Sequence, residues 1–347
     1  MYPNLYTVLV GRPATGKGAA IDPALEILKE AGTANVLSDR LTIEYVLEKL
    51  SKGFPSTTLN AGTLTVGVDS SAIVFAPELS VFIRDSSDSL SDLTQLWDNR
   101  DSFDYGTRHK GLYTVNKPCL SMLGGSPPAW LAKSIPNDAV GGGFTRRVNF
   151  VYTKNDPHLP TWSFASNGTR PITKDDLVED LRYISSNIRG EFRADKKFER
   201  AFDAYTAGIK FEDFDDEATT GFKASKWVNA VKLAMVLSVS RGDDRILIED
   251  DWATATMRVE QVEQDLGLVF RAVGESDDTA AAAKILDFIE KRGVTSLSDI
   301  MRSLWRHVSK PDAERIMSTF VSAQVVSEST SGHTVLYTCM LKRTGGP

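Results

Sequence analysis

The chain has 347 residues, of which 41% are hydrophobic and 25% are charged, and its net charge is −6. This composition is that of a globular protein, and no apolar run approaches the roughly 20 residues of a membrane span, so disordered and membrane-embedded classes are excluded. Cys119 and Cys339 lie far apart, and the first residues lack the basic and apolar regions of a signal peptide. We therefore expect a soluble, cytoplasmic protein of two or three domains without a membrane partner.

The first half of the chain alternates short apolar runs with helical patterns. Five runs are typical of buried strands: residues 5–10, 34–37, 72–75, 119–123 and 148–152. Apolar residues at helical spacing follow the first two runs, and Pro23 is expected to kink or delay the first of these helices. This alternation predicts an α/β fold with a parallel sheet, which we place in a domain of residues 1–155.

The second half of the chain is predominantly helical. Turn-forming residues between 154 and 171 indicate a domain exit. Apolar residues at three- and four-residue spacing then predict helices at residues 177–188, 198–209, 227–239 and 252–269. We assign them to a helical lid domain of residues 156–275. Three further helical stretches and two β-rich segments around a Ser-Gly turn follow, and this order predicts a winged helix in residues 276–347.

The segment between the first strand and the first helix matches a phosphate-binding P-loop. Its candidate nucleotide-binding residues are Gly11, Arg12, Pro13, Ala14, Thr15, Gly16, Lys17 and Gly18. In such a loop, backbone N–H groups surround the phosphates and the lysine neutralises the β and γ oxygens. A Ser or Thr that binds Mg²⁺ normally follows the lysine, but Gly18 stands there. The loop therefore predicts ATP binding better than ATP hydrolysis; the alternative is a glycine turn with a surface lysine.

The segment after the third strand supplies one of the two acidic residues that an ATPase uses. Such an enzyme holds Mg²⁺ with an Asp and polarises the attacking water with a Glu. Residues 73–78 read Ile-Val-Phe-Ala-Pro-Glu, so Glu78 is present and the Asp is absent. Glu78 is either this catalytic residue or a solvated residue after a strand. His and Cys residues lack zinc-ligand spacing, so we predict no resident metal and expect Mg²⁺ to arrive with the nucleotide.

Together these segments resemble a phage and prophage family of helicase-like AAA+ ATPases related to superfamily-three replicative helicases. The resemblance extends over residues 4–152. It rests on the loop described above and on residues 76–82, 93–98, 120–128 and 141–147. It implies a hexameric ring motor that hydrolyses ATP and acts on single-stranded nucleic acid, with DNA favoured. The cytoplasm of a bacterium or of a phage-infected host is the implied location.

The resemblance also implies roles for individual residues. The catalytic set that it implies is Lys17, Glu78, Ser126, Arg146 and Arg147. Lys17 and Glu78 would act within one subunit, and Ser126 would be the polar sensor after the fourth strand. One of the two arginines would reach the γ-phosphate of the neighbouring subunit as an arginine finger, which stabilises transition-state charge. In the lid, Lys226 is the candidate second sensor, and Lys223 competes with it.

Two departures from the family pattern leave other functions open. Gly18 and Ala76-Pro77 differ at both magnesium-supporting positions, so turnover is expected to be slow or to use another carboxylate, Asp69 or Asp98. One alternative is a nucleotide-stabilised assembly or DNA-binding protein that does not hydrolyse ATP. A weaker alternative is an adenylate-type kinase, which also has Gly-Lys-Gly but continues with Thr where Ala19 stands here. Turnover of ATP that nucleic acid stimulates would distinguish a motor from both.

A β-hairpin is predicted immediately before the fourth strand. Residues 103–115 contain two β-rich arms around a basic, glycine-ended tip of Arg108, His109 and Lys110. In superfamily-three helicases the hairpin at this position enters the pore of the ring. The resemblance therefore implies that the three tip residues bind single-stranded nucleic acid. Taken alone, the charge pattern favours an exposed hairpin whose basic tip serves solubility and edge protection.

Overall fold

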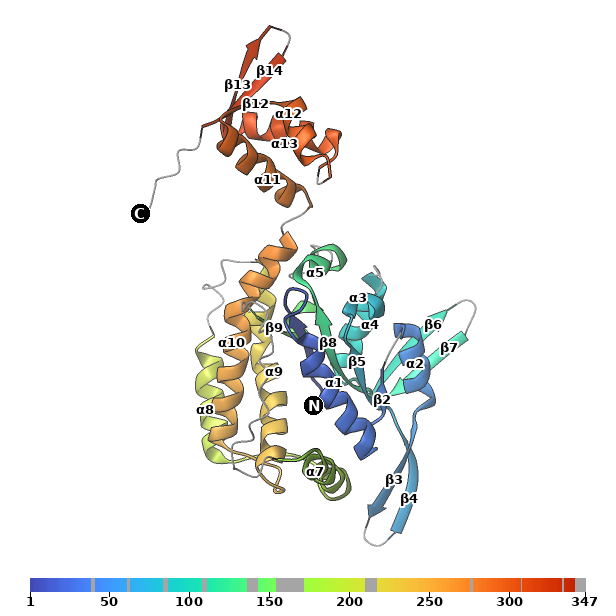
Figure 1. The fold of residues 1–347 in the computed structure, drawn as a ribbon. Coiled ribbons are helices and arrows are strands. Elements are labelled where there is room, and N and C mark those ends of the chain that lie inside the picture. Colours follow the sequence, from blue (N-terminus) through green and yellow to red (C-terminus); the bar gives the residue numbers. More distant parts are fainter. Residues whose placement is uncertain are drawn as a thin grey trace. The chain divides into compact units, whose positions relative to one another are not determined.

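The computed structural model describes residues 1–38, 41–60, 63–83, 87–107, 111–135, 143–153, 172–209, 217–274, 277–306, 308–332 and 334–340. By their internal contacts the residues form two units, Met1–Ala272 and Val273–Pro347. The described residues form twelve α-helices and a central parallel sheet, so the predicted mixed α/β architecture is confirmed (Figure 1). Within these ranges, none of the helices combines the length and apolar character that crossing a membrane requires.

The central sheet of the first unit has five parallel strands in the order β2-β5-β8-β1-β9. They are β1 (Tyr6–Val10), β2 (Val36–Leu37), β5 (Ser71–Ala76), β8 (Cys119–Ser126) and β9 (Val148–Tyr152). Each contains part of one of the five predicted apolar runs. Alternate residues of β1, such as Tyr6 and Val8, are fully buried on one face. Because all five strands are parallel, the segments that leave them gather at one edge of the sheet, which we call the carboxyl edge, and the segments that enter them gather at the amino edge.

Helices connect these strands. They are α1 (Lys17–Ala31), α2 (Ile43–Lys52), α3 (Leu79–Phe82), α4 (Ser87–Trp97) and α5 (Pro128–Ser134). Pro23 lies inside α1, and the helix starts six residues before it, directly after Gly16. The expectation that Pro23 delays this helix was wrong, because the glycine turn ahead of the proline sets the start.

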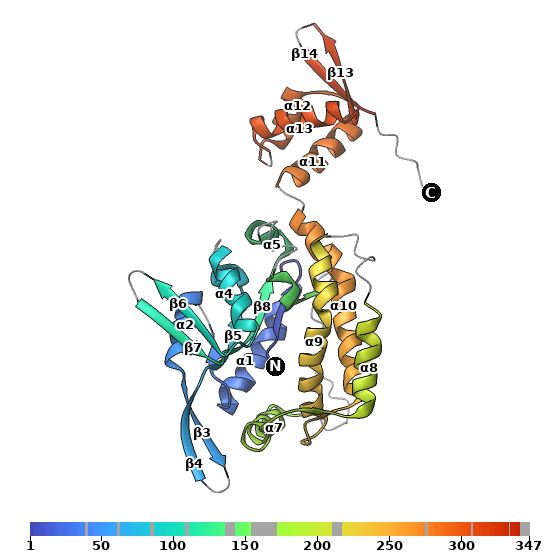
Figure 2. The ribbon, with the colours of Figure 1, turned by 180° about the vertical axis from the view of Figure 1, so that it is seen from behind.

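Two antiparallel hairpins project from the sheet on the side of α2 (Figures 1 and 2). The first consists of β3 (Phe54–Asn60) and β4 (Thr63–Asp69), and the sequence patterns did not predict it. The second consists of β6 (Ser102–Thr107) and β7 (Gly111–Asn116), so the arms of the predicted hairpin are confirmed. Its tip, Arg108, His109 and Lys110, lies outside the described residues.

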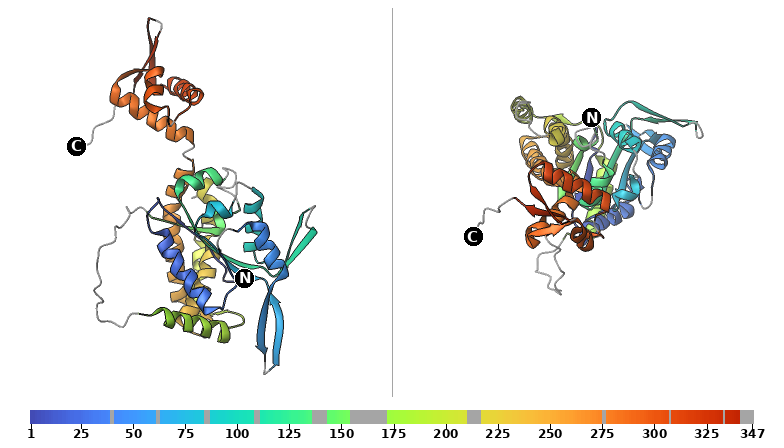
Figure 3. Two further views of the ribbon diagram at one scale, coloured as in Figure 1. Left: turned by 45° about the vertical axis from the view of Figure 1, so that its right-hand side comes forward. Right: turned by 90° about the horizontal axis from the view of Figure 1, so that it is seen from above.

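The helical part of the first unit contains α7 (Lys174–Asn187), α8 (Lys196–Ala207), α9 (Glu217–Arg241) and α10 (Glu249–Gly274). Short strands β10 (Arg193–Ala194) and β11 (Ile246–Leu247) pair between them. Helices α8, α9 and α10 lie side by side near β9 (Figure 1), whereas α7 lies against α1, where Lys174 pairs with Glu30 at 2.7 Å (Figure 3). All four predicted helices are present; their treatment as a separate lid domain stays a prediction.

The second unit has its own apolar core. Its elements are α11 (Asp277–Arg292), β12 (Val294–Ser296), α12 (Leu297–Leu304), α13 (Lys310–Ser322), β13 (Val326–Ser331) and β14 (Thr334–Cys339). The strands form an antiparallel sheet in the order β12-β14-β13, and Ile285, Ile300 and Ile316 of the helices pack in the core beneath it. Three helices and a terminal hairpin follow the predicted order, with β12 added; the winged-helix assignment itself stays a prediction.

Candidate functional site

The glycine loop, residues 11–17, leaves β1 at the carboxyl edge. Gly11 donates its N–H to the Ser126 carbonyl oxygen (3.2 Å), and a Cβ atom at Gly11 would come within 2.6 Å of Thr153 Cγ2. A larger residue there would therefore force Thr153 to shift. Ala14 and Gly16 have positive φ angles of 68° and 80°, and such left-handed residues turn successive N–H groups into an anion-binding concavity. The loop opens directly onto the N-terminus of α1, where the helix dipole also favours an anion.

Lys17 is the first residue of α1 and its ammonium lies over the glycine loop. Its Nζ donates hydrogen bonds to the carbonyl oxygens of Gly11 (2.7 Å) and Arg12 (2.8 Å). Burial lowers the pKa of Lys17 below its usual value, and the negative charge of Glu78 acts in the opposite direction. Lys17 and Glu78 are therefore close enough to interact electrostatically.

Glu78 and Ser126 lie at the same edge as Lys17. Strand β5 ends at Ala76 and β8 ends at Ser126, and both run parallel to β1. Glu78 is exposed and begins α3, whereas Ser126 is buried and donates its hydroxyl to the Pro127 carbonyl (3.1 Å). The structure thus brings together three of the predicted site residues from three strands.

Gly125 explains how the Glu78 segment is held against β8, and the sequence analysis missed it. A Cβ atom at Gly125 would come within 2.7 Å of the Pro77 carbonyl oxygen. A side chain at this position would push the exit of β5 away from Ser126. The adjacent glycines Gly124 and Gly125 inside a strand, which mark a close approach of another backbone segment, were the available signal.

Arg146 and Arg147 form a short 3₁₀ turn that leads into β9, so they lie at the amino edge, opposite Lys17. Arg147 is buried and makes a bidentate ion pair with Asp98: Nη2 lies 2.7 Å from Oδ1 and 2.9 Å from Oδ2. Its Nη1 also donates to the Gly143 carbonyl (2.6 Å). Arg146 is only partly buried; burial lowers its pKa, and the charge of Arg147 adds to this shift. Within one chain, the structure does not bring either arginine to Lys17.

The two carboxylates expected to replace the missing magnesium ligands lie at the wrong edge. Asp98 is engaged by Arg147, and Asp69 precedes β5, where it accepts hydrogen bonds from the Ser71 N–H (2.9 Å) and hydroxyl (2.6 Å). That expectation was wrong, because strand polarity separates both residues from the glycine loop. Asp22 lies there instead: its Oδ2 would be 3.7 Å from a Cβ atom at Gly18. The spacing of four residues on α1, which places Asp22 beside Gly18, was the available signal.

Lys226, the candidate second sensor, has partners in the helical segment. It forms an ion pair of 2.6 Å with Glu263 of α10 and lies over the ring of Tyr205. Burial acts to lower the pKa of Lys226, but the hydrogen bond and charge of Glu263 outweigh it and raise the pKa. Its competitor Lys223 is half-buried on the same helix. The sensor role stays a prediction for both.

A second buried cation, Lys232 of α9, was missed at the amino edge. Its Nζ donates to Asn4 Oδ1 (2.7 Å) and the Trp97 carbonyl (3.1 Å), and it lies 3.6 Å from the centre of the Trp97 ring. Burial lowers the pKa of Lys232 to about 7, against the opposing charges of Cys119 and Asp98. A cavity of about 550 Å³ is lined by Lys232, both arginines and Trp97. The partners of Lys232 are more than 130 residues away in the sequence, so no local sequence pattern predicts these contacts.

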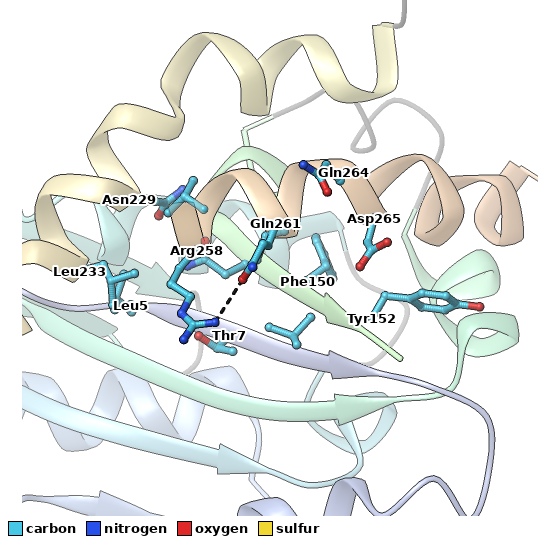
Figure 4. A pocket seen from close by; sticks show the side chains of 14 residues that line it. Leu5, Thr7, Phe150, Tyr152, Asn229, Leu233, Arg258, Gln261, Gln264 and Asp265 are labelled. Carbon is cyan, nitrogen blue, oxygen red and sulfur yellow. Dashed lines mark hydrogen bonds between the residues drawn. The ribbon is translucent and has the colours of Figure 1, made fainter. Parts of the chain in front are cut away.

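Another cavity, of about 620 Å³, separates the sheet from the helical segment (Figure 4). Thr7, Phe150 and Tyr152 line it from β1 and β9. On the helical side, Arg258 donates to Gln261 Oε1 at 3.2 Å, and both face the strands in Figure 4. Tyr152 pairs in register with Val10, the residue before the glycine loop. An occupant of this cavity would therefore contact the end of β9 beside the glycine loop as well as α9 and α10.

Comparisons with known proteins give little further information. No family model and no curated protein matches the chain. Among solved structures, the apo C-terminal region of the phage protein NrS-1 is similar, with a TM-score of 0.26 and 10% sequence identity. The alignment covers 97% of this chain and 66% of that region, so the chain spans slightly less than two thirds of its length. A likeness of this strength carries no functional argument.

Proposed function

We propose that the chain binds ATP at the glycine loop and works as a ring-shaped motor on single-stranded nucleic acid. The observation that carries the proposal is the meeting of Lys17, Glu78 and Ser126 at the carboxyl edge. Nucleotide hydrolysis uses a cation over the phosphates, a carboxylate that polarises the attacking water and a polar sensor. Lys17, Glu78 and Ser126 would fill these roles in that order. Glu78 is exposed at this edge, so water and a nucleotide can reach it.

The glycine loop fits a triphosphate with its metal ion. The left-handed Ala14 and Gly16 and the N-terminus of α1 supply the concavity, and Lys17 supplies the countercharge. Mg²⁺ prefers oxygen ligands, and the Thr15 hydroxyl and the Asp22 carboxylate are the nearby side-chain oxygens that suit it. Mg²⁺ would neutralise part of the charge on the phosphates. Lys17 would supply a second countercharge.

The separation of the arginines from Lys17 supports a site that is shared between neighbouring chains, as in a ring. An arginine at the amino edge cannot complete the site of its own chain, but a neighbouring chain can present it to the γ-phosphate. Arg147 is bound on two sides by Asp98 and Gly143. Arg146, which is only partly buried, is therefore our choice for the finger, and Arg147 is the residue that holds the turn.

The helical segment, the second unit and the β6–β7 hairpin also have roles in the proposed motor. Helices α8 to α10 would form the lid, the second unit would be a winged helix, and the tip of the β6–β7 hairpin would contact the nucleic acid. The alternative is a nucleotide-stabilised assembly that does not hydrolyse ATP, which the missing hydroxyl at Gly18 and the missing Asp at Ala76-Pro77 favour. An adenylate-type kinase ranks lower because, although its loop also has Gly-Lys-Gly, Ala19 stands where that loop has Thr.

ATP turnover with and without a single-stranded oligonucleotide tests the proposal. A motor predicts turnover that the oligonucleotide stimulates and that Glu78→Gln lowers by about 100- to 10,000-fold, the usual contribution of a catalytic proton acceptor. ATP affinity should survive this change, since the amide keeps the shape of the side chain. A protein that binds ATP but shows no turnover in either condition would be the non-hydrolysing assembly, and phosphoryl transfer to a nucleotide would identify a kinase.

A further inference from the structure

The segment that joins α12 to α13 in the second unit has an unusual composition. Residues 300–311 contain Arg302, Arg306 and Lys310 but neither Asp nor Glu, although the whole chain carries a net charge of −6. Trp305 lies between these cations, and 64% of its surface is exposed. An exposed indole presents an apolar face that a planar group can cover.

Two anchors hold this segment to the unit. Helix α12 ends at Leu304, and the Val308 N–H donates to the Leu304 carbonyl (3.0 Å) while the Val308 side chain is buried in the core of the unit. Ser309 then caps α13 by accepting the Asp312 N–H (3.4 Å). Trp305, between these two anchors, keeps helical backbone angles. Its side chain is exposed on the surface of the unit.

One of the cations lies over the exposed ring. The guanidinium carbon of Arg306 lies 5.2 Å from the centre of the Trp305 ring. Arg302 is three residues before Trp305, which keeps helical backbone angles, and this spacing places the two on one face. Lys310 begins α13 immediately after the turn. We call Arg302, Trp305, Arg306 and Lys310 the turn patch.

Helix α13, by contrast, has balanced charges. Its Arg315 lies 3.3 Å from Asp312, and the ammonium of Lys310 at its first residue lies 3.7 Å from Glu314. A helix that enters a duplex groove needs cations and polar groups that face the phosphates and bases. Arg302 and Arg306 instead lie before α13, and Lys310 stands at its first residue.

We propose that the turn patch binds single-stranded nucleic acid, with an unpaired base stacked on Trp305 and phosphates held by Arg302, Arg306 and Lys310. An aromatic face between cations is the combination that recognises single strands, since every base can stack and the backbone is anionic. A duplex offers no free base face to the indole. This site is independent of the glycine loop and of the β6–β7 hairpin, so it does not require the ring motor.

Fluorescence anisotropy of a labelled 30-nucleotide oligo(dT), measured with the full-length chain without nucleotide across a salt series, tests the proposal. Trp305→Ala should weaken binding about tenfold, the loss of one stacked base, and Trp305→Phe should recover most of it. The double variant Arg302→Ala, Arg306→Ala should lower the slope of log affinity against log salt by about 1.4, since each phosphate contact on a single strand contributes roughly 0.7.

Arg292→Ala is the matched control. Arg292 is an exposed arginine of the same unit that also lies over an aromatic ring, Phe288, at 5.7 Å. It should leave affinity and slope unchanged. Because the titration contains no nucleotide, a failure of the proposed ATPase would not affect the result. Unchanged affinity in Trp305→Ala would overturn the proposal. An equal loss on a duplex of the same length would show duplex binding instead, and binding to anionic vesicles with no oligonucleotide affinity would assign the patch to a membrane surface.

Discussion

The two edges of the central sheet use charge in opposite ways. At the carboxyl edge, Glu78 is exposed and Lys17 is half-buried, held by backbone carbonyls. At the amino edge, Arg147 and Lys232 are buried and bound by Asp98 and Asn4 within the same chain. Charges that a ligand can reach cost little in stability, whereas buried charges must be paired. The comparison therefore separates residues expected to affect ligand binding from residues expected to affect folding.

The largest expected effect is on ATP binding at the carboxyl edge. Lys17→Ala should lower ATP affinity by roughly 1,000-fold, about 4 kcal/mol, because two charge-assisted hydrogen bonds to phosphate are lost. Isothermal titration calorimetry measures this. Lys29→Ala, an exposed lysine near the end of the same helix, is the control and should bind ATP normally. Equal affinity in both variants would mean that the glycine loop does not hold phosphates.

The second effect should distinguish the adjacent arginines at the amino edge. Arg147→Ala leaves Asp98 without its bidentate partner and should lower the free energy of unfolding by about 3 kcal/mol. Arg146→Ala should change it by less than about 1 kcal/mol, because this side chain is only partly buried. Urea unfolding at pH 7 compares the two. If Arg146→Ala is the more destabilising change, the assignment of the finger to Arg146 has to be reversed.

The smallest effect is a pH dependence that comes from Lys232. Its pKa is about 7 in the folded chain and near 10.5 when unfolded, so between these values the unfolded state binds more protons. Stability should therefore rise with pH over this window, by about 2 kcal/mol from pH 7 to pH 9, and Lys232→Met should remove that rise. Lys226→Met serves as the control, since the pKa of Lys226 is raised and its titration lies above the window. A rise that persists in Lys232→Met would assign it to another group.

Features that depend on neighbours in sequence were predictable, and features that depend on distant pairs were not. The five strands follow from local apolar runs, and Lys17 follows from the spacing of Gly11 and Gly16 in one loop. The β3–β4 hairpin was missed because threonines and glycines interrupt its apolar residues. Arg147 and Asp98 are 49 residues apart, so only the assembled sheet edge shows that they meet. Asp69 was misjudged for the same reason. A carboxylate is a suitable magnesium ligand, but the direction of the strands places Asp69 at the amino edge, away from the glycine loop.

Strand polarity also has a consequence for how the protein would respond to dilution. Because the five strands run in one direction, each chain carries the glycine loop on one edge and the arginine turn on the other. If a complete catalytic site needs the glycine loop of one chain and the arginine turn of another, a single chain can bind the nucleotide but lacks the arginine for catalysis. Diluting the protein would then reduce turnover per chain while leaving nucleotide bound per chain unchanged, so its specific activity would depend on its own concentration.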